Sequence, residues 1–247
     1  MFYNPFSLQD KVILVTGASS GIGRAVAIEC SKMGAAVVIT GRNAERLDET
    51  YGLLAPGQKH LQLVADLTSK EAIETLASNL PLLDGVVHCA AIIKKLPLKF
   101  ISEKSFVEIN EANIIAPAIL TQKIIKRKVL KDNGSIVFIS SIAAKVASLG
   151  NIMYMASKGA INSLARGMAL ELAEKKIRVN CIEPALVKTN LTSVLTEQDM
   201  ENYEKKFPLG RFGKPEEIAY ACIYLLSDAA QWVTGTSITI DGGVTLR

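Results

Sequence analysis

Short apolar segments alternate with longer segments of helical periodicity along the whole chain. The apolar segments are rich in Val and Ile and hold hydrophobic residues at consecutive positions, as strands buried on both faces of a sheet do. Strands are predicted at residues 11–16, 35–40, 61–65, 85–89, 135–140, 178–182 and 237–240. Helices are predicted at residues 22–33, between the second strand and residue 49, at residues 69–79, at about 103–129 and about 152–174, and from about residue 215. This alternation predicts an α/β fold, a doubly wound parallel sheet of about seven strands with helices on both faces.

The same alternation continues through all 247 residues, without an internal repeat or a linker rich in Pro, Gly or Ser. We therefore expect a single domain over residues 1–247. The one irregular stretch runs from Pro184 to about Pro208. A long excursion beside the carboxyl ends of parallel strands is typical of functional loops, so we predict a substrate lid at about residues 186–207.

Composition and charge argue against several classes of partner. Hydrophobic residues make up 49% of the chain, and the net charge of +4 is only mildly basic. The densest basic run, residues 123–131, lies on a predicted helix; a nucleic-acid patch is the alternative there, but a solvated helix face is favoured because no aromatic residues are interleaved for stacking. No apolar stretch reaches the ~18 residues of a membrane helix. We expect neither a nucleic-acid partner nor a membrane.

Cysteine and histidine positions bear on compartment and metal binding. Cys30, Cys89, Cys181 and Cys222 stand far apart and form no Cys-x-x-Cys pair. Together with an N-terminus that does not resemble a signal peptide, this pattern favours reduced thiols in a cytoplasmic protein. The two histidines provide no His-rich cluster, so no metal site is expected.

A glycine-rich turn joins the first predicted strand to the first predicted helix. Gly17 allows the turn, Gly21 lets the backbone approach a diphosphate, and Gly23 permits close packing of the helix, whose N-terminus favours anions. The alternative is an ordinary glycine-rich turn, but its place in a strand–turn–helix unit favours a Rossmann-type dinucleotide site. The residues expected to contact the cofactor here are Gly17, Ser19, Ser20, Gly21, Ile22 and Gly23.

The end of the second strand bears on the choice of cofactor. An acidic residue there would bind the ribose 2′-hydroxyl of NAD, but the chain has Arg42 after Gly41. A guanidinium suits a 2′-phosphate, so NADP(H) is favoured and NAD is the less favoured choice. The alternative for Arg42 is an exposed residue at a helix start. Asp66, after the third strand, either caps the following helix, faces the adenine, or does both.

Tyr154 and Lys158 are four residues apart on a predicted helix and therefore share one face. A phenol has an ordinary pKa of ~10, and a neighbouring ammonium brings that pKa toward neutrality, which suits an acid/base. By itself the pair is equally typical of surface residues. Ser140 and Ser141, at the end of the preceding strand, favour the functional interpretation because they belong to the same crevice as the glycine turn.

These motifs together resemble the short-chain dehydrogenase/reductase family over essentially the whole chain. The matching residues are Thr16-Gly17-x-x-x-Gly21-Ile22-Gly23, Asp66, Asn113, Ser141, Tyr154-x-Ala156-Ser157-Lys158, Arg178-Val179-Asn180 and Asp241-Gly242-Gly243. The resemblance implies a catalytic tetrad of Asn113, Ser141, Tyr154 and Lys158. Spacing favours Asn113 over Asn110 and Ser141 over Ser140 as members of this tetrad.

The resemblance also assigns a role to each tetrad residue. Tyr154 would donate a proton to the carbonyl oxygen as hydride arrives, and Ser141 would hydrogen-bond the same oxygen. Lys158 would lower the pKa of Tyr154 and bind the nicotinamide ribose. Asn113 would kink its helix and hold a water of a proton relay. Ala90, Val187 and Thr189 complete the expected cofactor contacts, the last two at the carboxamide.

Two departures from the family pattern concern backbone near the cofactor. His88-Cys89-Ala90-Ala91 replaces the usual Asn-Asn-Ala-Gly, and Pro184-Ala185 replaces Pro-Gly. We interpret His88 as structural, with a ring nitrogen in place of the asparagine that tethers sheet backbone.

The resemblance implies an NADP(H)-dependent oxidoreductase that interconverts a carbonyl and a secondary alcohol. A 3-oxoacyl-[acyl-carrier-protein] reductase is one form of it, and sugar or polyol and hydroxysteroid dehydrogenases remain alternatives. A catalytically silent, cofactor-binding regulatory protein is an alternative from another class. The expected partners are a small-molecule carbonyl or alcohol and copies of the chain itself, as a homotetramer built through long helices and the last strand.

Overall fold

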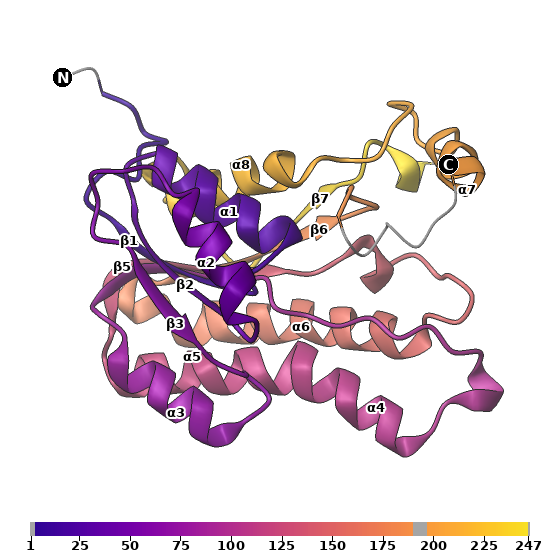
Figure 1. Ribbon diagram of the computed structural model, residues 1–247, viewed down its shortest axis with the longest axis horizontal. Coiled ribbons are helices and arrows are strands. Elements are labelled where there is room, and N and C mark those ends of the chain that lie inside the picture. Colours follow the sequence, from indigo (N-terminus) through magenta and orange to yellow (C-terminus); the bar gives the residue numbers. More distant parts are fainter. Residues whose placement is uncertain (1–2, 190–196, 247) are drawn as a thin grey trace.

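A computed structural model describes residues 3–189 and 197–246 of the chain. In these ranges seven strands form one parallel sheet of order β3-β2-β1-β4-β5-β6-β7, which confirms the predicted fold (Figure 1). The strands are β1 Val12–Thr16, β2 Ala36–Gly41, β3 Leu61–Val64, β4 Leu83–His88, β5 Leu130–Ile139, β6 Arg178–Pro184 and β7 Ser237–Ile240.

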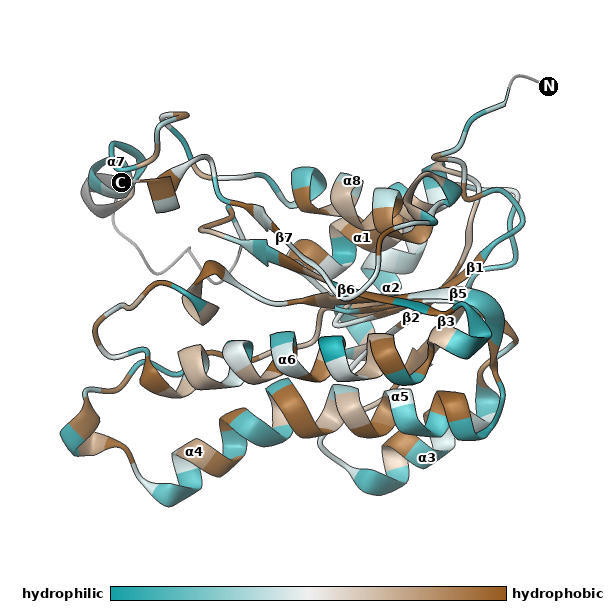
Figure 2. Cartoon of the chain, turned by 180° about the vertical axis from the view of Figure 1, so that it is seen from behind, coloured by the Kyte–Doolittle hydropathy of each residue, from teal (hydrophilic) through white to brown (hydrophobic). Residues whose placement is uncertain are grey.

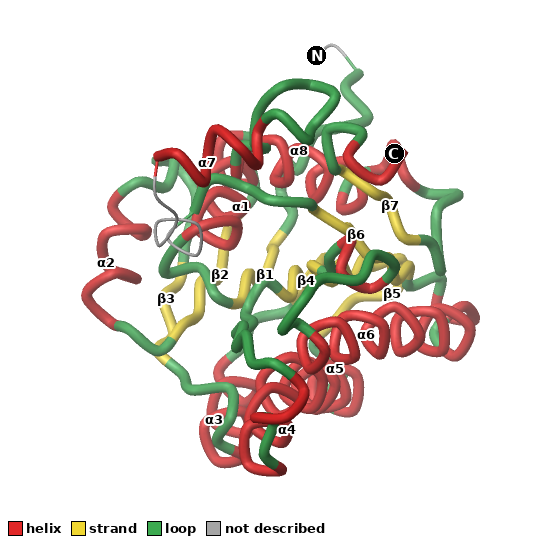
Figure 3. Tube along the Cα trace, turned by 90° about the vertical axis from the view of Figure 1, so that its right-hand side faces the viewer, coloured by secondary structure: helices red, strands yellow, loops and turns green. Residues whose placement is uncertain are grey.

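Helices cover both faces of this sheet, with α1, α2 and α8 on one side and α3, α4, α5 and α6 on the other (Figure 3). Their bounds are α1 Gly21–Lys32, α2 Ala44–Gly52, α3 Lys70–Asn79, α4 Glu103–Asn110, α5 Ala116–Lys126, α6 Ile152–Glu171, α7 Glu197–Glu204 and α8 Pro215–Leu226. Hydrophobic and hydrophilic positions alternate along α5 and α6, as expected of helices with one buried face (Figure 2).

The sheet divides the buried apolar residues into two cores. Along β1, Ile13 and Val15 join the core beneath α1 and α8, whereas Leu14 joins the core against α3, α5 and α6. Both faces of a strand are therefore apolar, which is why consecutive hydrophobic residues predicted the strands. At the carboxyl edge of the sheet, the loops between the two helical layers carry the candidate site.

Two segments differ most from those predicted. The helix expected over residues 103–129 is α4, a π-helical turn at Glu111–Ile115, and α5, which ends at Lys126. β5 begins at Leu130, five residues early, because its first part pairs with Leu83 before the register of β4 and β5 shifts. The predicted lid is described only in part: α7 lies within it, and residues 190–196 lie outside the described residues. None of the described helices is both long and apolar enough to cross a membrane.

Candidate active site

The glycine turn between β1 and α1 lies directly against the end of β4. Gly17 has φ +63°, and a Cβ there would stand 2.8 Å from the Cα of Ala90. Thr16 at the end of β1 fixes this contact, because its Oγ1 accepts hydrogen bonds from the amides of Cys89 and Ala90 at 3.1 and 3.2 Å. Glycine at position 17 is thus required both by backbone conformation and by space.

The N-terminus of α1 suits a diphosphate. A Cβ on Gly23 would lie 2.3 Å from the carbonyl oxygen of Gly17, so only glycine lets the helix begin this close to the turn. Ser20 precedes the helix without a side-chain capping bond, and the first turn holds no acidic residue. The first amides of a helix have no partner within it, so this end is open to an anion. Thr189 borders the same turn, with its side chain 3.3 Å from the position of a Cβ on Gly21.

Arg42 lies at the end of β2, beside the glycine turn. Its side chain is exposed, and a Cβ on the preceding Gly41 would lie 3.3 Å from the hydroxyl of Ser19. Arg24 reinforces this corner by donating to the carbonyl of Ser19 at 2.8 Å. A phosphate bound between Ser19 and Arg42 would meet a hydroxyl and a guanidinium, and the charge of Arg42 also helps to lower the pKa of Asp66.

Asp66 follows β3 and is exposed. Its carboxylate accepts hydrogen bonds from the amide and the hydroxyl of Thr68, which hold its pKa below the usual value. The capping residue of α3 is Ser69, whose side chain accepts from the amide of Ala72. Asp66 therefore shapes the turn before the helix and does not cap it, which settles one of the two roles expected for it.

His88 is buried at the end of β4 and has structural contacts. Its Nε2 lies 2.9 Å from the hydroxyl of Thr121, and its ring stacks on Phe138 with centroids 4.8 Å apart. Burial lowers its pKa to about 3, so the ring is neutral. The ring bonds a side chain of α5 and not the sheet backbone that we expected, while Nδ1 has no hydrogen-bond partner among the described residues.

Tyr154 and Lys158 lie on one face of α6, as their spacing predicts. The Nζ of Lys158 lies 5.4 Å from the centroid of the Tyr154 ring and donates to the carbonyl oxygen of Ile139 at 2.8 Å. Lys158 is only 3% exposed, and this burial lowers its pKa to about 8. The ammonium therefore lies beside the phenol and is held there by the carbonyl of Ile139, the last residue of β5.

The pKa of Tyr154 is shifted in the direction opposite to the one expected. Burial raises the pKa of the phenol, and a hydrogen bond with the Ser141 side chain opposes that rise. Lowering by Lys158 was the expectation, but desolvation of the phenolate is the larger effect in the protein alone. Tyr154 therefore keeps its proton in the resting protein.

Ser140 and Ser141 face different neighbours after β5. The hydroxyl of Ser140 is buried and donates to the carbonyl of Lys158 at 3.2 Å, so it fixes α6. The hydroxyl of Ser141 accepts from the amide of Ala143 at 3.1 Å and lies 3.5 Å from the carbonyl of Pro184. Ser141 is the serine whose side chain meets Tyr154, in agreement with the choice made from spacing.

Asn113 lies in the middle of the π-helical turn and is buried. Its Oδ1 accepts from the amide of Ile92 at 2.8 Å, and its Nδ2 donates to the carbonyl of the same residue at 2.9 Å. The Nδ2 also lies 3.1 Å from the hydroxyl of Ser157 on α6. Asn113 therefore ties the loop after β4 to the helix of Tyr154, and the wide turn directs its amide inward.

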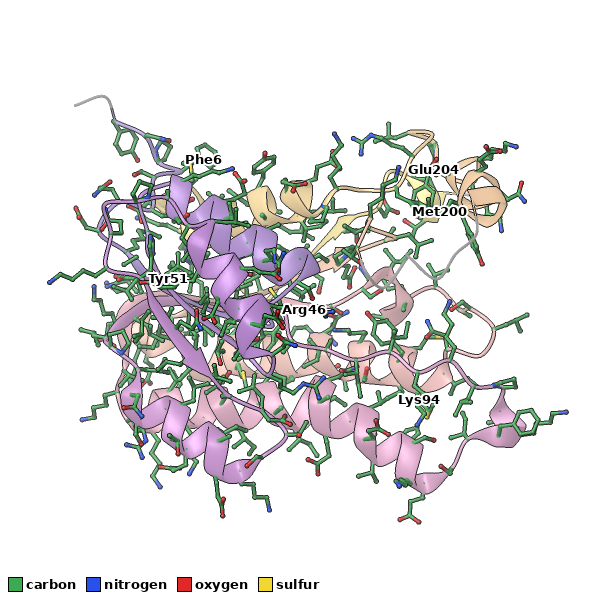
Figure 4. The ribbon with its side chains drawn as sticks, in the orientation of Figure 1. Phe6, Arg46, Tyr51, Lys94, Met200 and Glu204 are labelled. Atoms are coloured by element: carbon green, nitrogen blue, oxygen red, sulfur yellow. The ribbon has the colours of Figure 1, made fainter. Side chains whose placement is uncertain are left out.

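The loop after β6 brings Val187 and Thr189 over the glycine turn. Val187 pairs with Gly213 in a short parallel bridge, and the amide of Lys188 donates to the carbonyl of Gly213 at 2.9 Å. Lys188 also forms an ion pair with Glu204 of α7 at 3.2 Å, which links the described part of the lid to this loop (Figure 4). Over residues 3–189 and 197–246 no group of three or more acidic, histidine or cysteine side chains could hold a metal ion.

Together, the sheet order, the glycine turn and the Tyr–Lys pair define a dinucleotide-binding oxidoreductase. The family described as enoyl-(acyl carrier protein) reductase matches residues 17–245. The 3-oxoacyl-[acyl-carrier-protein] reductase FabG of Aquifex aeolicus is 32% identical over 244 residues, covering 96% of this chain and 98% of that protein. The gluconate 5-dehydrogenase of Gluconobacter oxydans is 33% identical over 248 residues, covering 98% and 97%.

A solved structure extends the similarity to three dimensions. The putative 2-deoxy-D-gluconate 3-dehydrogenase of Agrobacterium tumefaciens, determined with bound NADP, has a TM-score of 0.90 and 32% identity, covering 99% of this chain and all (100%) of that one. The chain belongs to the short-chain dehydrogenase/reductase family.

Proposed function

We propose that this protein is an NADP(H)-dependent oxidoreductase that reduces a carbonyl group or oxidises the corresponding secondary alcohol. The observation that carries the proposal is the meeting of Ser141, Tyr154 and Lys158 at the carboxyl edge of the sheet, beside the open N-terminus of α1. Asn113 completes the arrangement through its contact with Ser157 of α6, the residue before Lys158. A silent regulatory protein would have no need for a half-buried phenol beside a buried ammonium.

Each residue has a distinct task in this proposal. The bound nicotinamide supplies or accepts the hydride. Tyr154 donates its phenolic proton to the carbonyl oxygen, and Ser141 orients that oxygen by a hydrogen bond. Lys158, with a pKa lowered to about 8, stabilises the phenolate that remains and binds the ribose hydroxyls. In the direction of alcohol oxidation the same phenolate takes the proton back.

Arg42 supports NADP(H) over NAD(H), because it is exposed and directly follows Gly41, which lies against Ser19 of the glycine turn, and a guanidinium suits a 2′-phosphate. The structural relative of Agrobacterium tumefaciens was determined with bound NADP, which agrees with this assignment. Gly17, Gly21 and the amides around them would receive the diphosphate, and Val187 and Thr189 the carboxamide.

Two substrate classes have support from relatives. A 3-oxoacyl group on acyl carrier protein is the substrate that the name of the Aquifex aeolicus relative gives, and a sugar acid is the one that the name of the Gluconobacter oxydans relative gives. The two relatives are almost equally similar to the chain. We propose the 3-oxoacyl thioester as the first substrate class and the sugar acid as the second.

Absorbance of NADPH tests the proposal directly. We expect the cofactor to be consumed with a 3-oxoacyl thioester or a keto-sugar acid, and Tyr154→Phe to lower kcat by about 10³-fold or more while NADPH affinity stays within about twofold. Tyr220→Phe, on the exposed face of α8, is the matched control and should keep wild-type turnover. Binding of NADPH without turnover of any carbonyl compound would favour the regulatory alternative.

We further propose a single catalytic domain that assembles as a cytoplasmic homotetramer. Apolar side chains exposed along α4, the π-helical turn and α5, namely Phe106, Val107, Ile115 and Ile119, support a helical contact between subunits. Light scattering should give four times the mass of the chain, and a monomeric mass would contradict the proposal.

A further inference from the structure

Glu183 is a fully buried carboxylate that the proposed chemistry does not use. It is 0% exposed and stands one residue before the end of β6. A buried carboxylate is costly unless it is paired and hydrogen-bonded, so its partners show what it holds in place.

Both oxygens of Glu183 are engaged, by side chains from three different elements. Oε1 accepts from Nδ2 of Asn162 on α6 at 2.7 Å. Oε2 accepts from the hydroxyl of Thr239 on β7 at 2.9 Å and forms an ion pair with Nζ of Lys145 at 2.6 Å. Thr239 is the residue opposite Glu183 in the β6–β7 register, so the carboxylate is anchored to the sheet itself.

Asn162 connects this carboxylate to the face of α6 that carries the reacting groups. Tyr154, Lys158 and Asn162 follow one another at intervals of four residues, so they form a single stripe along the helix. The bond to Glu183 therefore holds α6 against β6 one turn beyond Lys158.

Lys145 connects the same carboxylate to the turn that carries Ser141. The turn runs from Ser141, whose hydroxyl accepts from the amide of Ala143, to Lys145, whose amide donates to the carbonyl of Ile142. The hydroxyl of Ser141 also lies 3.5 Å from the carbonyl of Pro184, the residue after Glu183. One end of the turn is thus fixed by Pro184 and the other by Glu183.

We propose that Glu183 is a positioning residue for the reaction, which sets the placement of the Ser141 hydroxyl relative to Tyr154 through Lys145 and Asn162. The inference rests on the proposed function. A small displacement of either hydroxyl changes the geometry of proton transfer, and such displacements lower rates by up to about 10²-fold.

Glu183→Gln tests this inference, because it keeps the shape of the side chain and removes the charge that holds Lys145. We expect kcat for carbonyl reduction to fall by about tenfold or more, with the Kd and KM for NADPH unchanged within about twofold. Glu29→Gln is the matched control, since Glu29 pairs with Lys32 at 2.7 Å and its side chain is only 13% exposed, on α1. The control should keep wild-type kcat.

A double-mutant cycle separates positioning of Ser141 from general loss of packing. In a Ser141→Ala background, Glu183→Gln should lower kcat by less than about twofold, because the hydroxyl that it positions is already gone. Lys145→Met is the second variant if Glu183→Gln does not fold, since the Lys145 side chain is 57% exposed, and it should lower kcat in the same Ser141-dependent manner.

The outcomes distinguish this inference from the function on which it rests. A wild-type protein that binds NADPH but turns over no carbonyl compound would overturn both. An active wild type with unchanged kcat in a folded Glu183→Gln or Lys145→Met variant would overturn the inference alone. An equal loss of kcat in the wild-type and Ser141→Ala backgrounds would do the same.

Discussion

Lys158 is predicted to destabilise the fold at neutral pH. Burial lowers the pKa of its ammonium from 10.5 to about 8, and that difference corresponds to about 3 kcal/mol of unfavourable free energy when the group is charged in the folded protein. Replacement by Met keeps a side chain of similar length and removes the charge. It also leaves the carbonyl of Ile139 without its donor, which costs about 1 to 2 kcal/mol.

The net result is that the inactive Lys158→Met variant should be more stable than the wild type by about 1 to 2 kcal/mol near pH 7. The sign of the pH dependence follows from linkage. Between about pH 8 and pH 10.5 the unfolded lysine holds its proton and the folded one has lost it, so wild-type stability rises with pH in this window. The variant lacks this gain, so its advantage should shrink by about 2 to 3 kcal/mol between about pH 7 and about pH 10.

Urea unfolding of both proteins at these two pH values measures the effect. Cys30, Cys181 and Cys222 are buried and Cys89 is partly buried, and burial raises the pKa of all four thiols and of Tyr154. These groups therefore keep their protons up to about pH 10 in both folded proteins, and both unfolded chains contain them, so they contribute little to the difference. A variant that is less stable than the wild type near pH 7, by an amount independent of pH, would refute the assignment of a strained ammonium to Lys158.

Three further substitutions test the cofactor site and its supports. Gly17→Ala places a Cβ 2.8 Å from the backbone of Ala90 at a φ of +63°, so the melting temperature should fall by an amount equivalent to about 1 to 3 kcal/mol and NADPH titration should show weakened binding. Asn113→Ala leaves the amide and carbonyl of Ile92 without their partner, and should lower the free energy of unfolding in urea by about 2 to 4 kcal/mol. Arg42→Ala should raise the KM for NADPH by about tenfold or more, while the KM for NADH stays unchanged. Equal effects on the two KM values would contradict the assignment of Arg42 to the 2′-phosphate.

The sheet and the glycine turn could be predicted because their signals are local. Consecutive apolar residues marked the strands, and Gly17, Gly21 and Gly23 marked a turn whose tight contacts the structure explains. The spacing of Tyr154 and Lys158 placed them on one helical face for the same reason.

The features that the sequence did not reveal depend on contacts between distant segments. The resemblance implied a kink at Asn113, but no periodicity reports the backbone of Ile92, which Asn113 bonds in the π-helical turn. Glu183 had the pattern of an ordinary polar residue at a strand end, and only the meeting of Lys145, Asn162 and Thr239 makes it a buried anchor. A carboxylate between the apolar Ile182 and Pro184, directly after the predicted strand, was the one available signal for it.

The wide turn at Glu111–Ile115 has a consequence for the length of the chain. A π-helical turn contains one residue more than an α-helical turn would use to connect α4 to α5. Deleting Ala112 would let α4 and α5 join as one regular helix, and the helix would gain regular hydrogen bonds as the inward amide of Asn113 turned away from Ile92. The surplus residue therefore keeps the inward amide of Asn113 on Ile92, and a shorter, more regular helix would separate the loop after β4 from the helix of Tyr154.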